Sequence, residues 1–188
     1  MILTELYDGE YKITSWFGPR TLANGDKRPH KGIDCVGLSS KNIIAVCDAT
    51  VMSSQQIADK TNATWEWGNY IKLNDGFGYS LFYCHLEKRL VIKGGKVRAG
   101  QVIGVEGQTG YSFGNHLHFE VRNAQGVSID PQDYFAILER REGKILTIDE
   151  AKQIVKAKAA LSDSTIQFLE NYKWGDDLFV KLAKAIIN

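Results

Sequence analysis

The 188-residue sequence has little of several kinds of residue, and each shortage excludes a class of protein. Its three cysteines, Cys35, Cys47 and Cys84, are odd in number and lack a repeated spacing, which argues against a disulfide framework. The formal net charge is only +1, so there is no electrostatic basis for binding nucleic acid or an anionic membrane. Since no apolar run approaches the length of a membrane span, we expect none.

The first residues also lack the features of an export signal. Met1 to Asp8 contain neither a basic region nor a long apolar region, so no secretory signal is visible. We therefore expect a protein that is made in the cytoplasm and leaves the cell by another route, or a mature secreted form from which the signal has been removed.

Histidine is scarce as well, and two of the four histidines stand close together. His116 and His118 lie in a short alternating run that follows a stretch rich in glycine, threonine and serine. On a β-strand, residues i and i+2 face the same side, so both imidazoles are expected to point to one place. Leu117 and Phe119 would then face the core. Two converging imidazoles suit a transition metal.

The other two histidines complete a recognisable set. His30 opens the sequence His-Lys-Gly-Ile-Asp that ends at Asp34, and His85 follows an aromatic-rich run. With His116-x-His118, these residues resemble the lysostaphin/LytM-type zinc endopeptidases, which cut peptide cross-links in bacterial peptidoglycan. Similar segments are also found at Ile13–Arg20, Val97–Gly104 and Asp130–Pro131. The resemblance covers roughly residues 10 to 135 and leaves the last third of the chain unexplained.

The resemblance implies a role for each of these side chains. Zinc would be held by His30, Asp34 and His118, with a fourth position left for water, whose pKa zinc lowers toward about 7. His85 and His116 would stand off the metal, one as general base and the other binding the oxyanion or protonating the leaving amine. Which residue does which stays open. Ordinary structural histidines are the alternative, but all four fall in the family's positions.

Short strands and closely spaced turn signals predict a mainly β catalytic domain over residues 1–142, and the resemblance implies that its sheet is antiparallel. The turn at Asn74–Gly78 is the strongest signal. The expected strands are 11–16, 32–36, 43–47, 50–53, 69–73, 79–83 and 102–105. The resemblance adds a groove with the metal at its floor and loops as its walls.

Residues 57–68 have no clean period and are expected to form a hairpin excursion or a long loop. Within them, Trp65 and Trp67 either line a substrate groove or pack on one face of a strand. Cys35 and Cys84 adjoin predicted site residues. Since neighbours in a strand point to opposite faces, both thiols are expected to face the core rather than a metal.

Three charged residues near the predicted site each have two interpretations. Glu120 shares a strand face with His118, where it either orients an imidazole or is a charge on the rim. Arg20 and Arg28 flank His30, and they either meet carboxylates of the substrate or are solvated charges of a loop.

Residues 143–188 are predicted to form a helical C-terminal extension, after a short helix that opens near Asp130. One helix begins at Asp149 with Ile154, Ala157 and Leu161 on one face. A second is capped by Ser162, and a third runs over 176–187. The extension contains no histidine or cysteine, so we expect no metal chemistry there. Its apolar faces need a partner, which suggests targeting or a homo-oligomer.

The sequence therefore predicts a zinc-dependent endopeptidase that hydrolyses the peptide cross-links of peptidoglycan, with a phage-type lysin as one form of it. It would act at the bacterial cell wall after release. The alternative from another class is a non-catalytic peptidoglycan-binding protein, or a component of cell-wall morphogenesis or of a virion. No metal ligand is missing, which favours the enzyme.

Overall fold

The computed structural model describes residues 5–182 except 22–24, 26, 58, 63, 142–147, 160, 171–177 and 180. Contacts divide the chain into two compact units, Met1–Leu138 and Glu139–Asn188. The boundary predicted after residue 142 falls inside a segment that lies outside the described residues. The sequence of residues 143–148 also predicts a linker or a short strand, and apart from Ile148 this stretch lies outside the described residues.

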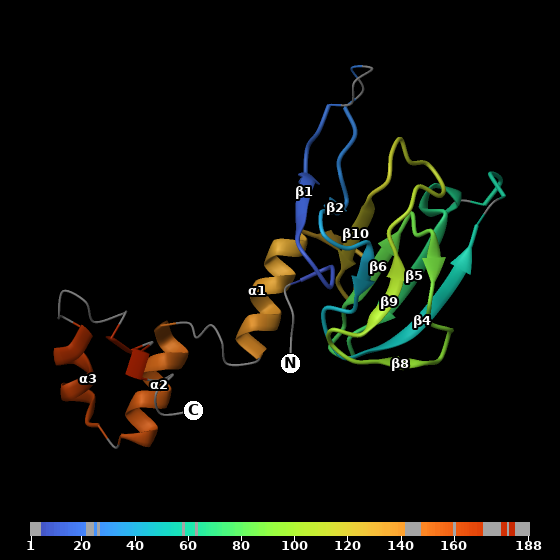
Figure 1. Cartoon of the computed structure of the whole chain (residues 1–188). Helices are drawn as coiled ribbons and strands as arrows, with labels where there is room; N and C mark the ends of the chain where they lie inside the picture. Colours follow the sequence, from blue (N-terminus) through green and yellow to red (C-terminus); the bar gives the residue numbers. More distant parts are fainter. Residues whose placement is uncertain are drawn as a thin grey trace. The chain divides into compact units, whose positions relative to one another are not determined.

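The first unit is mainly β, and all of its paired strands are antiparallel, which confirms the predicted fold class (Figure 1). The larger sheet has the order β1-β2-β10-β6-β5-β4-β8, with β11 beside β10. These strands are β1 Tyr11–Ser15, β2 Ile33–Gly37, β10 Leu117–Arg122, β6 Ser80–Cys84, β5 Asn69–Asn74, β4 Ala49–Gln56, β8 Lys96–Val97 and β11 Ser128–Ile129. The smaller sheet joins β3 Asn42–Ile44, β9 Val102–Val105 and β7 Lys88–Arg89.

The period of two along the strands decides which side chains are buried in the main core. Cys35, Tyr83, Leu117 and Phe119 are fully buried on one face of the larger sheet. The alternate residues of the same strands face the other side, because successive side chains of a strand point in opposite directions. This other face of β2 and β10 carries Asp34 and His118 of the predicted site.

The helix α1 (Pro131–Arg141) packs on the main core through Tyr134, Phe135 and Leu138. The Phe135 ring stacks on Phe119 with 5.9 Å between ring centroids and 3° between planes. Because these side chains are buried with the strands, α1 is part of the first unit's core, although its last turn extends beyond Leu138.

One predicted strand is shorter than expected, and one interpretation of the two tryptophans is wrong. The apolar run 43–47 is a strand only as far as Ile44, and Ala45 to Cys47 continue as a buried connection. Residues 57–68 contain a 3-10 helix, η1 (Trp65–Trp67), so packing of the two tryptophans on one strand face is wrong. Trp67 instead packs on a second cluster with Tyr70 and Phe82.

The second unit contains α2 (Ile148–Lys158) and α3 (Asp163–Glu170) around a small cluster of Ala151, Val155 and Phe179. Ile154 and Leu161 pack against this cluster, as their spacing predicts, whereas the Ala157 side chain lies outside the described residues. Ser162 Oγ accepts the Thr165 N–H at 3.2 Å, which confirms the predicted cap. Most of the third helix, predicted over 176–187, also lies outside the described residues.

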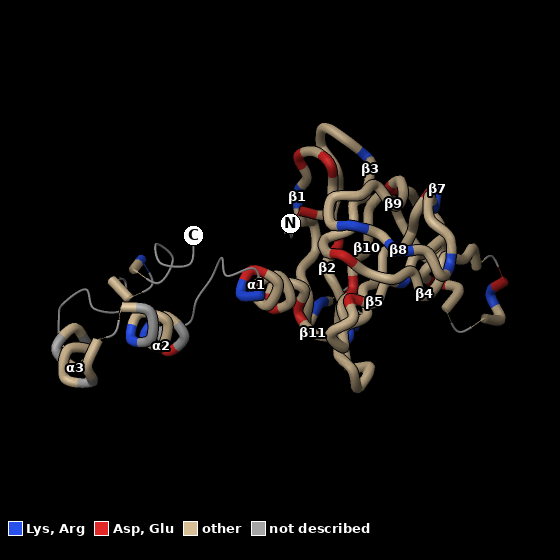
Figure 2. The backbone as a smooth tube through the Cα atoms, turned by 90° about the horizontal axis from the view of Figure 1, so that it is seen from below, with Lys and Arg blue, Asp and Glu red and all other residues tan. Residues whose placement is uncertain are grey.

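Within the described part of the chain, no helix is both long and apolar enough to cross a membrane. Lysines, arginines, aspartates and glutamates are interspersed along the β-strands and their loops (Figure 2). This distribution agrees with the near-zero net charge of the sequence.

Candidate active site

The pairing of β10 between β2 and β6 places the first two side chains of the site. His118 lies directly opposite Asp34 in β2 and opposite Cys84 in β6. Directly opposed residues of an antiparallel pair have their side chains on the same face, about 5 Å apart at Cβ. His118 and Asp34 therefore meet on the face opposite the main core, as the alternation in the sequence predicts.

His30 reaches the same place from the loop between β1 and β2. Its backbone pairs with Gly18 through two hydrogen bonds of 2.8 and 2.9 Å, and its side chain is only 3% exposed. The Nδ1–H donates to the Trp16 carbonyl at 2.8 Å. This hydrogen bond fixes the proton on Nδ1 and leaves the Nε2 lone pair directed at Asp34 and His118.

Three donor atoms now form a small triangle. His30 Nε2 lies 3.1 Å from Asp34 Oδ1 and 3.1 Å from His118 Nδ1, and the latter two are 2.9 Å apart. A tetrahedral zinc with bonds near 2.0–2.1 Å has its ligand atoms about 3.3 Å from one another. Two imidazole nitrogens and one carboxylate oxygen are also donors that zinc accepts. The residues present therefore fit a zinc ion.

The electrostatics of Asp34 support this fit. Burial alone would raise the pKa of Asp34, but the close contacts of its carboxylate with the His118 and His30 rings outweigh burial and hold the pKa far below its usual range. Arg20 Nη1 also donates to Asp34 Oδ2 at 3.3 Å. The carboxylate therefore stays ionised, with one oxygen held by Arg20 and the other facing the two imidazoles.

Glu120 is a buried partner of His118, with an exposed fraction of 1%. The alternative that it is a rim charge is therefore wrong. Its Oε2 lies 3.9 Å from His118 Nε2, while Oε1 accepts hydrogen bonds from Arg122 Nε at 2.7 Å and Ser128 Oγ at 2.6 Å. Arg122 in turn lies over the rings of Phe82 and Trp67. The carboxylate is thus fixed where it can keep the His118 proton on Nε2 and free Nδ1.

His85 enters the site through an unusual backbone conformation. Since Cys84 lies opposite His118, a regular continuation of β6 would turn His85 toward the main core. His85 instead has φ of 65°, and its own N–H donates to the Trp67 carbonyl at 2.9 Å. Such a φ is rare for a residue other than glycine and is found where function requires it. It brings the His85 ring beside His116 and His118.

The prediction that the Cys84 side chain faces the main core is therefore wrong. Cys35 is in the main core as expected, but Cys84 lies on the site's face of the sheet, in the cluster of Tyr70 and Phe82. Burial raises the pKa of the Cys84 thiol well above its ordinary value. A protonated, fully buried thiol is a poor metal ligand, so the prediction that Cys84 is no ligand is unaffected.

The imidazole of His85 is held by Thr109. His85 Nδ1–H donates to the Thr109 carbonyl at 2.8 Å, and Thr109 Oγ1 accepts the Asn69 N–H and donates to the Leu86 carbonyl. Burial and the neighbouring His116 and His118 lower the pKa of His85 to about 4. His85 is therefore neutral at pH 7, with an unprotonated Nε2.

His116 is held in the same way, although it stands just before β10. Its Nδ1–H donates to the Gly114 carbonyl at 2.8 Å, and Ser112 Oγ lies 3.1 Å from the same nitrogen. The Nε2 atom is 3.7 Å from Asp34 Oδ1, and the ring centroid is 4.7 Å from that of His85. All five predicted site residues therefore come together, with His85 and His116 beside the triangle of donors.

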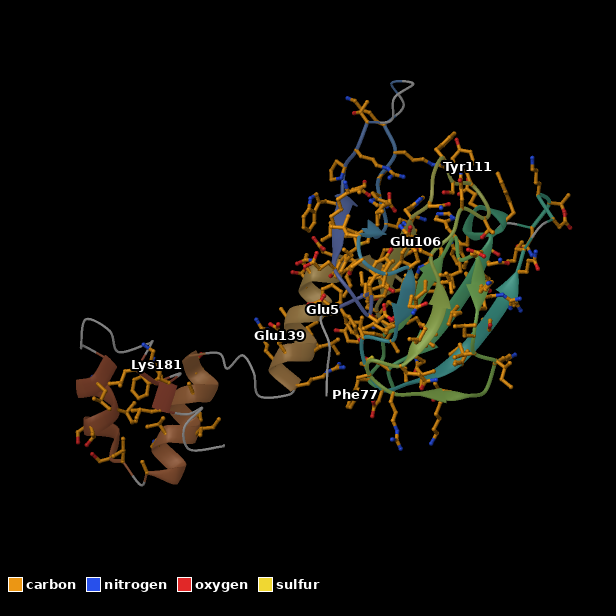
Figure 3. The ribbon with its side chains drawn as sticks, in the orientation of Figure 1. Glu5, Phe77, Glu106, Tyr111, Glu139 and Lys181 are labelled. Atoms are coloured by element: carbon orange, nitrogen blue, oxygen red, sulfur yellow. The ribbon has the colours of Figure 1, made fainter. Side chains whose placement is uncertain are left out.

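Aromatic side chains that sequence reasoning missed lie in the loop that leads into β10. Tyr111 packs edge-on against Trp65 of η1 and against Phe113, which is 87% exposed. Figure 3 shows Tyr111 at the end of the β unit opposite Phe77. The loops after β1 and before β10 and β5 gather at this end of the sheet (Figure 1). The only clue to Tyr111 and Phe113 in the sequence is their position in the glycine-rich segment that precedes His116.

The sequence pattern of peptidase family M23 matches residues 28–131, a range that contains all five site residues. The match takes in more than half of the chain, and the chain belongs to this family. Membership confirms the resemblance to lysostaphin-type peptidases, whose solved structures share the fold.

Individual relatives match the same part of the chain. Peptidoglycan DD-endopeptidase ShyA of Vibrio cholerae is 37% identical over 116 residues, which are 61% of this chain and 25% of ShyA. Murein hydrolase activator NlpD of Escherichia coli is 34% identical over 133 residues, which are 71% of this chain and 31% of NlpD. The chain thus spans about a quarter to a third of these relatives.

A solved structure described as a zinc-containing peptidase from Vibrio cholerae has the same fold. It superposes with a TM-score of 0.60 at 32% identity, covering 69% of this chain and 39% of that one. The family and this neighbour both point to a metal, in agreement with the donor triangle of His30, Asp34 and His118.

The triangle generates a prediction about metal content. The purified protein is expected to contain about one zinc per chain, and His118→Ala or Asp34→Ala to lose most of it, because two remaining ligands compete poorly with water. Elemental analysis after gel filtration measures this. Asp133→Ala, which removes an exposed acid from α1, serves as the control and should keep its zinc. Full zinc content in both site variants would contradict the proposed ligand set.

The buried carboxylate of Glu120 generates a second prediction. Glu120→Gln is expected to weaken zinc binding by about 10- to 100-fold, because the amide holds the His118 tautomer less firmly. Competition with a chromophoric chelator gives the affinity, and thermal unfolding measured alongside separates it from loss of fold. Glu87→Gln removes an exposed acid and should bind zinc normally. Equal zinc affinity in a folded Glu120→Gln protein would show that Glu120 is only structural.

Proposed function

We propose that this protein is a zinc-dependent endopeptidase that hydrolyses peptide cross-links of bacterial peptidoglycan. The observation that carries the proposal is the juxtaposition of two kinds of groups. His30, Asp34 and His118 offer three donor atoms 2.9–3.1 Å apart, and two further imidazoles, of His85 and His116, stand beside them. Similarity to ShyA, whose name describes a peptidoglycan DD-endopeptidase, supports the substrate class.

Bound zinc would supply a Lewis acid that acidifies a water molecule and polarises the scissile carbonyl. The chain's own residues supply proton transfer and orientation. His85 and His116 each donate Nδ1–H to a backbone carbonyl, so each presents Nε2 to the reacting groups. A neutral imidazole in this position can take a proton from water, and once protonated it can give a proton to the leaving amine. We assign these two proton transfers to His85 and His116 together, without stating which histidine performs which.

The low pKa of His85 suits a group that starts the reaction unprotonated, because burial and two neighbouring imidazoles disfavour its cation. Arg20 and the backbone acceptors hold Asp34 and the rings in place before substrate arrives. This preorganisation means that little rearrangement accompanies the reaction.

A second candidate function is activation of another cell-wall hydrolase without catalysis. It is favoured by the similarity to the murein hydrolase activator NlpD, which takes in 71% of this chain. The presence of all five site residues in one place favours the enzyme over this alternative. Action at the cell wall after release, as in a phage-type lysin, belongs to the proposal as well. Digestion of purified sacculi, with mass spectrometry of the products, tests the activity and identifies the bond cleaved.

His85 and His116 are expected to serve catalysis and not metal binding. His85→Ala and His116→Ala should each keep zinc and the fold, yet lose roughly 100-fold or more in kcat, as expected for a lost acid–base group. Steady-state kinetics on a soluble cross-link peptide, paired with zinc analysis of the same preparations, measures both properties. A variant without zinc would identify that histidine as a ligand, and wild-type turnover would remove it from the mechanism.

The C-terminal unit is proposed to serve targeting or assembly. A chain that ends at Gly143 keeps α1 and should still fold, bind zinc and cleave soluble cross-link peptides, because Tyr134, Phe135 and Leu138 complete the main core. It should lose activity on intact walls or change its oligomeric state. Light scattering and parallel assays on peptide and sacculi measure these outcomes. An insoluble product would place the C-terminal unit in the catalytic core, and unchanged mass and wall activity would leave it without this role.

A further inference from the structure

A pocket of about 420 Å³ opens in the loop that joins β1 to His30. Its lining includes three cations and, among the described residues, no acid. The lining residues are Pro19, Arg20, Thr21, Lys27, Arg28 and Pro29. None of the roles assigned above uses this pocket.

The pocket is built on a braced backbone. Gly18 and His30 exchange two backbone hydrogen bonds, and the Arg28 N–H donates to the Arg20 carbonyl at 3.0 Å. Thr21 and Lys27 form a further antiparallel bridge. Two of the chain's three prolines, Pro19 and Pro29, lie in its walls and fix φ there. The two arms of the loop that line the pocket are therefore joined by backbone hydrogen bonds.

Arg20 connects the pocket with the donor triangle. Its Nη1 donates to Asp34 Oδ2 at 3.3 Å, while its Nε is buried and has no hydrogen-bond partner among the described residues. A buried donor without a partner is costly, so this N–H calls for an acceptor. The pocket thus begins one side chain away from Asp34.

Arg28 contributes a charge that can change partners. Its Nη2 contacts Glu66 Oε1 of η1 at 3.2 Å, and the two side chains are 51% and 44% exposed. Ion pairs with this exposure contribute little to stability. An incoming anion can therefore replace Glu66 as the partner of Arg28 at small cost. Lys27 lines the same pocket and is exposed.

We propose that this pocket binds a carboxylate of the peptide that occupies the site. An arginine fork binds a carboxylate with charge-assisted hydrogen bonds, and Lys27 adds a second positive charge. The carboxylate belongs to an acidic residue near the scissile bond or to a free peptide C-terminus. The proposal rests on the proposed function for its choice of ligand, and it adds a preference for anionic cross-link peptides over amidated ones.

The test uses the full-length, zinc-loaded protein and a cross-link peptide whose scissile amide is replaced by a ketomethylene group. The first peptide carries free carboxylates. In the second, only the C-terminal carboxylate is converted to the carboxamide, and in the third, only the carboxylates of the acidic residues are converted to carboxamides. Isothermal titration at low salt is expected to show about tenfold tighter binding of the free acid than of one amidated form, in the range of a hydrogen bond to a charged group. The form that loses affinity identifies which carboxylate is bound.

Variants locate the effect. Arg28→Gln and Lys27→Gln are expected to lose most of the preference for the acid without weakening the binding of the carboxamide. Glu66→Gln keeps Arg28 but removes its competitor, so it should bind the acid more tightly. Lys96→Gln on β8 removes the same charge outside the pocket and should leave both affinities unchanged. Thermal unfolding and zinc content verify that each variant is intact.

Equal affinity of the wild-type protein for acid and carboxamides would overturn the proposal, as would failure to bind any of the peptides. A preference that survives in the Lys27→Gln/Arg28→Gln double variant would overturn it too. Hydrolysis of the natural peptide is measured separately. Hydrolysis without a preference for the acid would contradict the carboxylate site but not the proposed endopeptidase activity. Acid-selective binding without hydrolysis would contradict the endopeptidase activity but not the carboxylate site.

Discussion

The register of β10 against β2 is the constraint on which the site depends. Pairing His118 with Asp34 puts an imidazole and a carboxylate on the same face, and the same register sends Leu117 and Phe119 into the main core. Because the side-chain period of a strand is two, a slip by one residue would exchange the two faces. Burial of the apolar face therefore fixes the position of the polar one. The core and the site are in this sense specified by one set of strand pairings.

A second common feature is that three imidazoles of the site each have one nitrogen held by a hydrogen bond to the backbone, and the fourth faces a buried carboxylate. Backbone carbonyls of Trp16, Thr109 and Gly114 accept from three of the rings, and the carboxylate of Glu120 faces the fourth. With these tautomers, the remaining nitrogens of His30, His118 and His116 lie 3.1, 2.9 and 3.7 Å from Asp34 Oδ1. Such fixed tautomers are what a metal site and a proton-transfer pair both need, since neither can function with a ring that turns or carries its proton on the wrong atom.

Much of this could be predicted from the sequence because it follows from periodicity. The i and i+2 spacing of His116 and His118 indicates their common face, and the short alternating runs indicate the β-strands, whereas the antiparallel sheet is implied by the resemblance to the peptidase family. The backbone of His85 could not be predicted in this way. If His85 faces the site, alternation alone sends Cys84 into the main core. In the structure Cys84 lies on the site's face, and the positive φ of His85 brings its ring to the site as well. Contacts between distant segments, such as Arg28 with Glu66 or Arg122 with Trp67, depend on tertiary packing that no local pattern encodes.

The location of zinc in a crystal of the purified protein, found from anomalous scattering at the zinc absorption edge, tests the central claim most directly. The account predicts one strong peak in contact with His30 Nε2, Asp34 Oδ1 and His118 Nδ1 at about 2 Å from each, with the rings of His85 and His116 beside the ion and still bonded to their backbone carbonyls. A peak coordinated by His85 or His116, or the absence of zinc from this triangle in a crystal grown with the metal, would contradict it.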